Sequence, residues 1–445
     1  MHDHAPPASD KAFPKPLAAF EHLMLADARP GHPMTFFLEC EVEGPLCLDR
    51  LRGAVAAAAR RHPLVRSRVA WRGGRPNWLP PDVEPAIELA GPDAWRPIDI
   101  TAESGLRLVV FSTRDRHRIV MVAHHAAIDG VAGGEFFGDL WACYDGREPP
   151  PFGPGRRRPP AATATPTSSG PFGSTWPFVA FRPQPLARFV GFPPAADGHH
   201  GASLEPPYAW RTLDRDLTTA VRNVVATNGW SLNDLVVAAV MRAAGRWNDR
   251  AGLGAGNVRI TLPVSLRSAG ARSPACNDLA YAFLDRTPSE CSDAQGLAAG
   301  LAAATRWIVE HDAAREFLAA ADILSRRPLL LRAITRLPVC FSTAVVSTIG
   351  DPSRRMKSGV PKRDGLDAPG GLVIRGIRGV PPLRPGTRAA LATTTYAGEL
   401  TLTCLCSAVP DGRPSRPAAR EFLAIVADEI TAFVERRAPP AGRPG

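Results

Sequence analysis

The stretch Met121-Val-Ala-His-His-Ala-Ala-Ile-Asp-Gly130 decides how the rest of the chain is interpreted. The β-favouring residues at 118–123 predict a buried strand that ends on His124 and His125. The Asp-Gly pair at the end of the stretch predicts a turn toward a helix at about 133–144. Because side chains alternate between the two faces of a strand, only one histidine is expected to face a given cavity. We therefore expect one histidine to act as a base and the other to be structural.

The segment His124–Gly130 (HHAAIDG) fits HHxxxDG, the signature of the CoA-dependent acyltransferase superfamily, at every position. This superfamily includes chloramphenicol acetyltransferase, peptide-synthetase condensation domains, plant alcohol acyltransferases, polyketide-associated acyltransferases and wax ester synthases. Two later stretches resemble wax ester synthase-like acyltransferases, namely the Asn-Asp helix start within 231–247 and the strand Pro263-Val-Ser-Leu-Arg267. The resemblance covers about 20–440 of the chain, with its motifs at these few places.

The resemblance implies an α/β (α+β) fold with two chloramphenicol-acetyltransferase-like α/β sandwich domains and an active-site tunnel between them. The acyl donor and the nucleophile are then expected to enter the tunnel from opposite mouths. Composition predicts a crossover linker in the middle of the chain, because its Pro-, Ser- and Thr-rich sequence cannot sustain a helix or a sheet. The expected parts are a loose N-terminal segment (1–16), an N-terminal acyltransferase-like subdomain (17–147), the Pro-rich crossover linker (148–207) and a C-terminal acyltransferase-like subdomain (208–445).

The histidine pair carries the expected chemistry. A neutral imidazole, whose ordinary pKa is about 6.5, accepts a proton at cellular pH and so can activate a hydroxyl or an amine. The resemblance implies that His125 is this base, that His124 shapes the site and that Gly130 permits a tight turn. Because a thiolate leaves an acyl thioester readily, we expect no tightly bound cofactor, and acyl-CoA or a phosphopantetheinyl carrier thioester is expected as a substrate. A metal site is disfavoured, since neighbouring histidines on a strand diverge and no Cys, Asp or Glu cluster lies nearby.

Two further roles follow from the resemblance. Asp129 is expected to form a buried ion pair with an arginine from the other half of the chain, and Arg267 is the candidate partner; a solvated strand end is the alternative for Arg267. Ser347 and Thr348 are candidate donors to the oxyanion of the tetrahedral intermediate. The alternative for each is an ordinary hydroxyl at a strand end. The family's Asp-Phe-Gly-Trp-type element is not recognisable in this sequence.

Composition limits the partners. The formal charge of +10 comes almost entirely from arginine, because only four of the 53 basic residues are lysine. Together with the high Ala, Pro and Gly content, this pattern indicates a GC-rich genome and no nucleic-acid footprint. CoA phosphates or an acidic carrier protein are the expected acidic partners, and the run Arg156–Arg158 is either a solvated loop or a phosphate contact. The eight scattered cysteines form no CxxC, and no run of about 18 apolar residues occurs. We expect a cytoplasmic protein with no transmembrane segment.

Periodicity and turn residues predict an alternation of strands and helices on both sides of the linker. The expected strands are 34–42, 65–71, 106–112, 117–123, 210–213, 258–264, 344–348, 389–396 and 399–407. The expected helices are 48–61, 133–144, 217–228, 231–247, 294–324, 329–337 and 415–437.

Three functional hypotheses remain. The first is an acyltransferase that moves an acyl group from a CoA or carrier-protein thioester to a hydroxyl or amine, forming an ester or amide in secondary or lipid metabolism. The second is a stand-alone condensation enzyme of a non-ribosomal peptide or polyketide pathway, working on a carrier-bound donor. The third is a non-catalytic condensation-like module that only recruits partners. The intact His-His-x-x-x-Asp-Gly favours catalysis.

Overall fold

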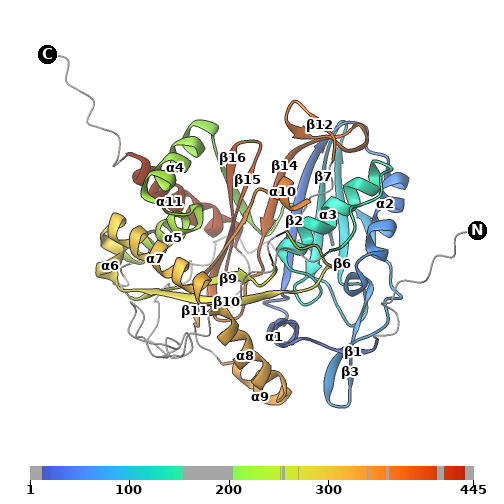
Figure 1. Ribbon diagram of the computed structural model, residues 1–445, viewed down its shortest axis with the longest axis horizontal. Helices are drawn as coiled ribbons and strands as arrows, with labels where there is room; N and C mark the ends of the chain where they lie inside the picture. The colour runs from blue at the N-terminus through green and yellow to red at the C-terminus, as the bar shows by residue number, and fades with distance from the viewer. Residues whose placement is uncertain are drawn as a thin grey trace, which may run out of the picture.

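The computed structural model describes residues 13–153 and 204–435, apart from short gaps at 251, 253–255, 269, 338–339, 357–359 and 408–414. Most of the segment expected to be loose (1–16) and of the predicted linker (148–207) therefore lies outside the described residues. The same holds for Arg156–Arg158. Within the described part, two mixed α/β halves lie side by side, each built on its own sheet (Figure 1).

The first sheet carries the histidine motif. Its strands run in the order β14 (Val373–Val380), β2 (Thr35–Glu43), β7 (Arg116–His124), β6 (Leu106–Thr113) and β5 (Ile87–Leu89). The predicted β6–β7 hairpin forms as an antiparallel pair, and β2 pairs antiparallel with β7 along its whole length. Helices α2 (Leu48–Arg60) and α3 (Gly130–Tyr144) pack on each other and on this half of the molecule (Figure 1).

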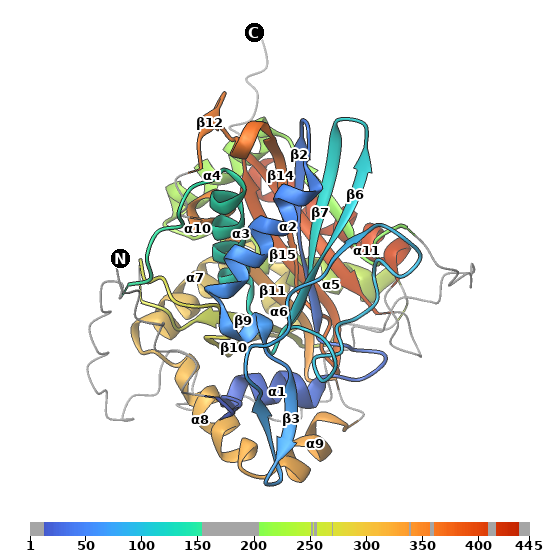
Figure 2. The same ribbon diagram turned by 90° about the vertical axis from the view of Figure 1, so that its right-hand side faces the viewer.

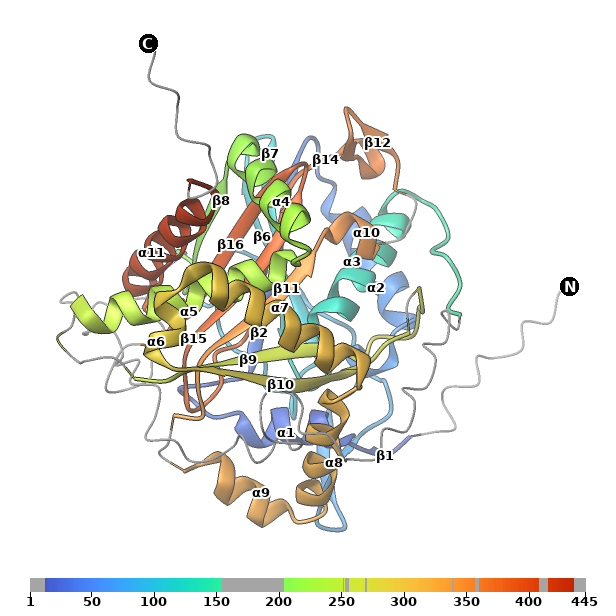
Figure 3. The ribbon, with the colours of Figure 1, turned by 60° about the vertical axis from the view of Figure 1, so that its left-hand side comes forward.

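The second sheet belongs to the C-terminal half. Its strands run in the order β10 (Leu279–Arg286), β9 (Val258–Ser265), β11 (Ser342–Gly350), β15 (Thr387–Tyr396), β16 (Glu399–Cys406) and β8 (Ala209–Leu213). The helices of this half are α4 (Arg215–Asn228), α5 (Leu232–Arg250), α6 (Pro288–Ser292), α7 (Ala294–Glu310) and α11 (Arg416–Glu435) (Figure 3). Most of the α5 helix is buried, and its predicted cap forms, since Ser231 and Asp234 exchange hydrogen bonds.

Smaller elements gather at one end of the molecule, the lower end in Figures 1 and 2. They are α1 (Ala19–Asp27), α8 (Ala314–Ser325), α9 (Pro328–Thr335) and a three-stranded sheet of β1 (Lys15–Pro16), β4 (Arg75–Trp78) and β3 (Val69–Arg72). At the opposite end lies the hairpin of β12 (Lys362–Arg363) and β13 (Leu366–Asp367), while α10 (Pro352–Met356) packs against α3 (Figure 1).

The C-terminal half contributes one strand to the N-terminal sheet. β14 comes late in the chain, yet it is an edge strand of the N-terminal sheet, where it pairs with β2. Arg378 on β14 forms an ion pair with the fully buried Glu39 on β2. On its other side β14 contacts the second sheet, because the Thr403 hydroxyl on β16 donates to the Gly379 carbonyl. A single boundary near residue 208 therefore does not describe the architecture.

Several sequence expectations are corrected. The strand expected at 65–71 begins only at Val69, because Pro63–Arg66 forms a 3₁₀ turn with proline in its first position. The helix expected at 294–324 is two helices, α7 and α8, separated where Asp312 adopts a left-handed φ of 51°. No Gly or Pro marks that break. The sequence reasoning also missed α1, β10 and β14.

Candidate active site

Both histidines are fixed at the end of β7 by backbone hydrogen bonds. The amide of His124 donates to the Gly105 carbonyl (2.9 Å) and the amide of His125 donates to the Met34 carbonyl (2.8 Å), so strands on both sides hold the motif. Gly105 allows the chain to pass close to the motif, because a Cβ there would lie 2.5 Å from the Cβ of Ala127. Backbone hydrogen bonds alone therefore fix the position of the two histidines at the end of β7.

The two imidazoles occupy different surroundings. His124 is buried, its Nδ1 accepts from the Ala126 amide (3.1 Å), and burial lowers its pKa to about 3. His125 lines a pocket, and burial also lowers its pKa, although a hydrogen bond to its own backbone opposes the shift. Both rings are thus held neutral at pH 7, and only His125 is placed at a cavity.

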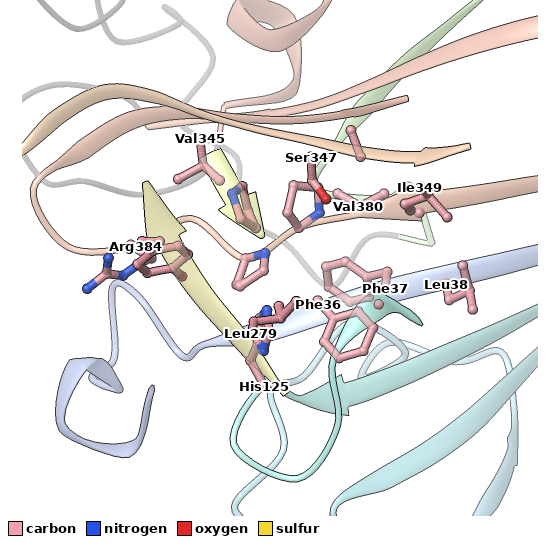
Figure 4. A pocket seen from close by; sticks show the side chains of 17 residues that line it. Phe36, Phe37, Leu38, His125, Leu279, Val345, Ser347, Ile349, Val380 and Arg384 are labelled. Atoms are coloured by element: carbon pink, nitrogen blue, oxygen red, sulfur yellow. The ribbon is translucent and has the colours of Figure 1, made fainter. Parts of the chain in front are cut away.

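The pocket at His125 is small and largely apolar. We call it the His125 pocket; its volume is about 50 Å³. Its lining comes from both halves and includes Phe36, Phe37, Leu38, Tyr281, Val345, Ser347, Val380 and Arg384. Figure 4 shows His125 on one side of this pocket and Ser347 with Val345 on the other. The base candidate therefore faces residues contributed by the second sheet.

A larger cavity adjoins it. This second cavity, the α5 pocket, has a volume of about 630 Å³ and lies at the start of α5, with Trp230, Asn233, Thr305 and Arg306 in its lining. The two pockets share lining residues, which are Gly130, Pro263, Leu279, Ser347 and Ile349. A volume of this size is within the range of small-molecule sites.

Gly130 stands where the two pockets meet. It is the first residue of α3 and its φ is not positive, so the turn itself does not require glycine, contrary to the expectation from the sequence. A Cβ at this position would find no atom within 4 Å. The missing side chain instead leaves space open between the pockets.

Asp129 and Arg267 meet across the two halves. The Arg267 Nη1 lies 2.6 Å from the Asp129 Oδ2, and both side chains are buried. Asp129 also accepts from the amides of Ala132 (2.9 Å) and Asp278 (2.9 Å), so it caps α3 while it holds the second half. Burial alone lowers the pKa of Arg267, but the Asp129 carboxylate outweighs it and raises that pKa. The pair locks the motif loop and leaves no free carboxylate to act as a base.

One loop of the second half, between β9 and β10, makes most of these cross-contacts. Besides Arg267 and the Asp278 amide, it supplies Asn277, whose Nδ2 donates to the His125 carbonyl and lies 3.1 Å from the ring Nδ1. Farther along, Arg272 pairs with the fully buried Asp139 of α3. The loop therefore holds both the base candidate and the helix that follows it.

The two hydroxyls proposed for the oxyanion are placed differently. Ser347 lines both pockets, whereas Thr348 lines only the α5 pocket. The Thr348 hydroxyl donates to the Asn233 Oδ1 (2.8 Å). Ser347 is therefore the better placed of the two to contact a group bound beside His125.

No group of three His, Cys, Asp or Glu side chains within the described residues is arranged to hold a metal ion. In the same part of the chain, no single helix is long and apolar enough to span a membrane. The pair α4 and α5 meets that length and composition test only together, across a bend of 106°.

Comparison with known proteins gives the fold. No family model matches the sequence. Chondramide synthase cmdD from Chondromyces crocatus is 28% identical over 138 residues, which is 25% of this chain and 4% of that protein, so the chain spans a small fraction of this curated relative. Among solved structures, the first condensation domain of the calcium-dependent antibiotic synthetase matches 97% of this chain and 98% of its own, with 17% identity and a TM-score of 0.61.

Two further structures match over nearly their whole length. Trichothecene 15-O-acetyltransferase TRI3 from Fusarium sporotrichioides covers 97% of this chain and 100% of its own, with 14% identity and a TM-score of 0.65. Polyketide synthase associated protein 5 from Mycobacterium tuberculosis covers 95% and 99%, with 16% identity and a TM-score of 0.60. The chain has the condensation-domain fold.

Three residues around His125 were not predicted from the sequence: Tyr281 and Arg384 line the His125 pocket, and Asn277 donates to the His125 carbonyl. Tyr281, Arg384 and Asn277 lie far from the histidine motif in sequence and belong to no pattern that marks them. Arg384 donates to Asp27 (2.7 Å) and stacks over the Tyr281 ring at 4.9 Å. Its positive charge helps to keep the pKa of His125 low.

Proposed function

We propose that the chain is an acyltransferase in which His125 removes a proton from a hydroxyl or amine acceptor as that acceptor attacks an acyl thioester. The observation that carries the proposal is a neutral His125 in a pocket that is lined by both halves and that shares five lining residues with the larger α5 pocket. The condensation fold supports it, because neighbours with this fold include a 15-O-acetyltransferase and a synthetase condensation domain.

The proposed reaction uses the chain's own groups. We assign the ring proton to Nδ1, because the ring hydrogen-bonds the backbone of His125 itself. The Asn277 Nδ2 then donates to the His125 carbonyl and not to Nδ1, and Nε2 keeps a free lone pair. Nε2 accepts the proton of the acceptor, whose oxygen or nitrogen bonds to the thioester carbonyl carbon. The tetrahedral intermediate then collapses, the C–S bond breaks, and the proton held by His125 passes to the leaving thiolate. The Ser347 hydroxyl is the proposed donor to the oxyanion.

The donor is proposed to occupy the α5 pocket and the acceptor the His125 pocket. Acyl-CoA and a carrier-bound acyl thioester share the same reactive end, so both fit the proposal as substrates, and no resident cofactor is required by this chemistry. The alternative of a stand-alone condensation enzyme in a peptide or polyketide pathway is favoured by one observation, the local similarity to a chondramide synthase.

Intact-mass screening of products tests the proposed function. The full chain is incubated with a panel of acyl-CoAs and acyl-carrier proteins together with alcohol and amine acceptors. An acyl-transfer product with either donor supports an acyltransferase, and a product with carrier-bound donors alone supports the condensation alternative. A non-catalytic recruitment module would bind carrier protein and give no product with any pair.

A further inference from the structure

Helices α8 and α9 form a pair at the lower end of the molecule in Figure 1 and expose large apolar side chains to solvent. Leu329 is 85% exposed and Ile323 is 67% exposed, and Leu330 and Leu337 are each about half exposed. Exposed leucines at single sites are ordinary, but a cluster within fifteen residues of sequence marks an interaction surface.

The α9 helix is apolar on two faces. Its inner face holds the buried Leu331 and Thr335, and the Thr335 hydroxyl donates to the Ala26 carbonyl of α1 (3.2 Å). Its outer face carries the exposed Leu329 and Ala333, which are four residues apart, and the exposed Leu337 follows just beyond the end of the helix at Thr335. The inner face explains how α9 is anchored, and the outer face has no such partner among the described residues.

Cations flank these exposed apolar side chains. Arg326, Arg327, Arg332 and Arg336 are all exposed, and no carboxylate occurs between the first of them and Leu337. Arg326 pairs with Asp322 on α8 at 2.6 Å. Arginine combines a permanent charge with an apolar stem that can lie along an apolar surface.

A tryptophan lies at the same end. Trp71 on β3 is 56% exposed and packs against the ring of His22, with centroids 6.2 Å apart. His22 in turn hydrogen-bonds the backbone of Ser325, the last residue of α8. Figures 1 and 2 both place β3, α8 and α9 at this end. Tryptophan is enriched at boundaries where one part of its ring contacts an apolar phase and the other part contacts water.

This surface connects to the candidate active site. Phe317 of α8 packs on Tyr281, with ring centroids 5.3 Å apart, and Tyr281 lines the His125 pocket. Helix α8 therefore packs against one wall of that pocket.

We propose that this end of the molecule docks on an anionic lipid surface. We call it the α8–α9 tip; it comprises Trp71, Ile323, Leu329, Leu330, Leu337, Arg326, Arg327, Arg332 and Arg336. Apolar side chains flanked by arginines fit the boundary between lipid head groups and acyl chains, where both charge and apolar area contribute to binding. The helix α9 has eight residues and is far too short to cross a bilayer, so it lies in the interface.

The lipid surface is preferred over an acidic protein because of the shape and chemistry of the tip. The helix pair lies at the end of the molecule (Figure 1), its leucines at 329, 330 and 337 are exposed, and none of these lines a pocket described above. A protein partner would need a groove to receive them, whereas a bilayer accepts them without one.

Vesicle flotation with the full chain tests the proposal. The vesicles are phosphatidylcholine alone, or phosphatidylcholine and phosphatidylglycerol in equal parts. We expect binding to the mixed vesicles that weakens as salt rises. The variant Leu329→Ser/Leu330→Ser/Leu337→Ser should bind at least about tenfold more weakly, as should Arg326→Gln/Arg327→Gln/Arg332→Gln/Arg336→Gln.

Matched controls separate the tip from the rest of the surface. Leu89→Ser removes another exposed leucine, 62% exposed, on β5. Arg60→Gln/Arg211→Gln/Arg222→Gln/Arg420→Gln removes four exposed arginines from other elements and equals the tip variant in charge. Both controls should bind mixed vesicles like the parent chain, and thermal melts should show that every variant is folded.

Three results would overturn the proposal. Absence of vesicle binding by the parent chain is one, and equal loss in the tip and control variants is another. The third is a parent chain that does not bind vesicles but forms a dimer, or a complex with an acidic carrier protein, that the leucine variant no longer forms. The vesicle assay needs no turnover, so failure of the acyltransferase proposal leaves it unaffected.

Discussion

The Asp129 carboxylate makes two kinds of interaction, a helix cap and an ion pair. It caps α3 through the Ala132 amide and binds Arg267 from the other half. Removal of one member of a buried ion pair leaves the other charged and unpaired. At this residue the motif is therefore structural, and the aspartate's place beside the histidines does not make it a second base.

We predict that Asp129→Ala lowers the free energy of unfolding by about 3–5 kcal/mol. Denaturant melts of Asp129→Ala, Arg267→Ala and the double variant measure it. The double variant should be less destabilised than the sum of the single variants, because the second change removes the stranded charge. Asp49→Ala, which breaks an exposed pair with Arg52, is the control and should cost nothing measurable. Additive losses at Asp129 and Arg267 would show that the pair is not coupled.

The burial of His125 lets us predict how kcat/KM depends on pH. Burial disfavours the imidazolium, so the folded protein holds the pKa of His125 below its ordinary value of 6.5. The neutral base then persists to lower pH, and kcat/KM should fall on the acid side with a midpoint below 6.5. Circular dichroism over the same range checks that the fold survives, because His124 is also buried neutral. An acid limb at or above 6.5 would contradict this environment for His125.

Among the helices and strands, α3 and α10 pack with their backbones in close contact at Gly138. A Cβ at Gly138 would lie 2.0 Å from the Met356 carbonyl oxygen of α10, and backbone atoms cannot move aside as a flexible side chain can. Gly133, on the same helix, would place its Cβ at ordinary contact distances, 3.6 Å and more, from Leu38 and Phe36.

We therefore predict that Gly138→Ala lowers the melting temperature and that Gly133→Ala does not. Both changes add one methyl group to one helix, so helix propensity alone favours both equally. Differential scanning calorimetry of the two variants decides the matter. Equal melting temperatures would show that α10 does not pack on α3 as the structure has it.

The sequence predicted the elements that carry their own local signal. The β6–β7 hairpin, the capped start of α5 and the hairpin turn at Ala397–Gly398, where both residues have positive φ, follow from alternation, capping and turn chemistry. Segments whose structure depends on distant partners were missed. β14 has two interior glycines and forms a strand because it pairs with the edge of β2, and α7 ends at Glu310, just before the left-handed Asp312, with no Gly or Pro to mark the break.

In the candidate site, too, residues with a local sequence signal were predicted and residues that depend on distant contacts were not. The motif placed His124 and His125 at the end of a strand and Asp129 in the turn before a helix, and the structure brings Arg267 to Asp129. Asn277 and Arg384 reach His125 only through the fold, since no spacing in the sequence connects them to the motif. Local motifs therefore identify the reacting group, while its surroundings come from tertiary packing.

At the scale of the whole molecule, the chain carries a formal charge of +10. If this charge attracts the phosphates of CoA, the KM for acyl-CoA should rise as salt shortens the Debye length from about 10 Å toward 3 Å. The same acyl group on N-acetylcysteamine, which has no phosphate, is the matched control and should give a KM insensitive to salt. A flat KM for acyl-CoA would mean that the arginine excess is compositional. The run Arg156–Arg158 lies outside the described residues, and its triple alanine variant tests that run separately.

We propose that the two halves of the chain assemble one site in which His125 is the base. Single-turnover acyl transfer by His125→Ala, with melting temperature as the control for folding, tests it most directly. Loss of a general base costs on the order of 10²–10⁴-fold in rate, and we predict that loss with a melting temperature close to that of the parent chain. A folded His125→Ala protein that transfers acyl groups at the parent rate would contradict the account.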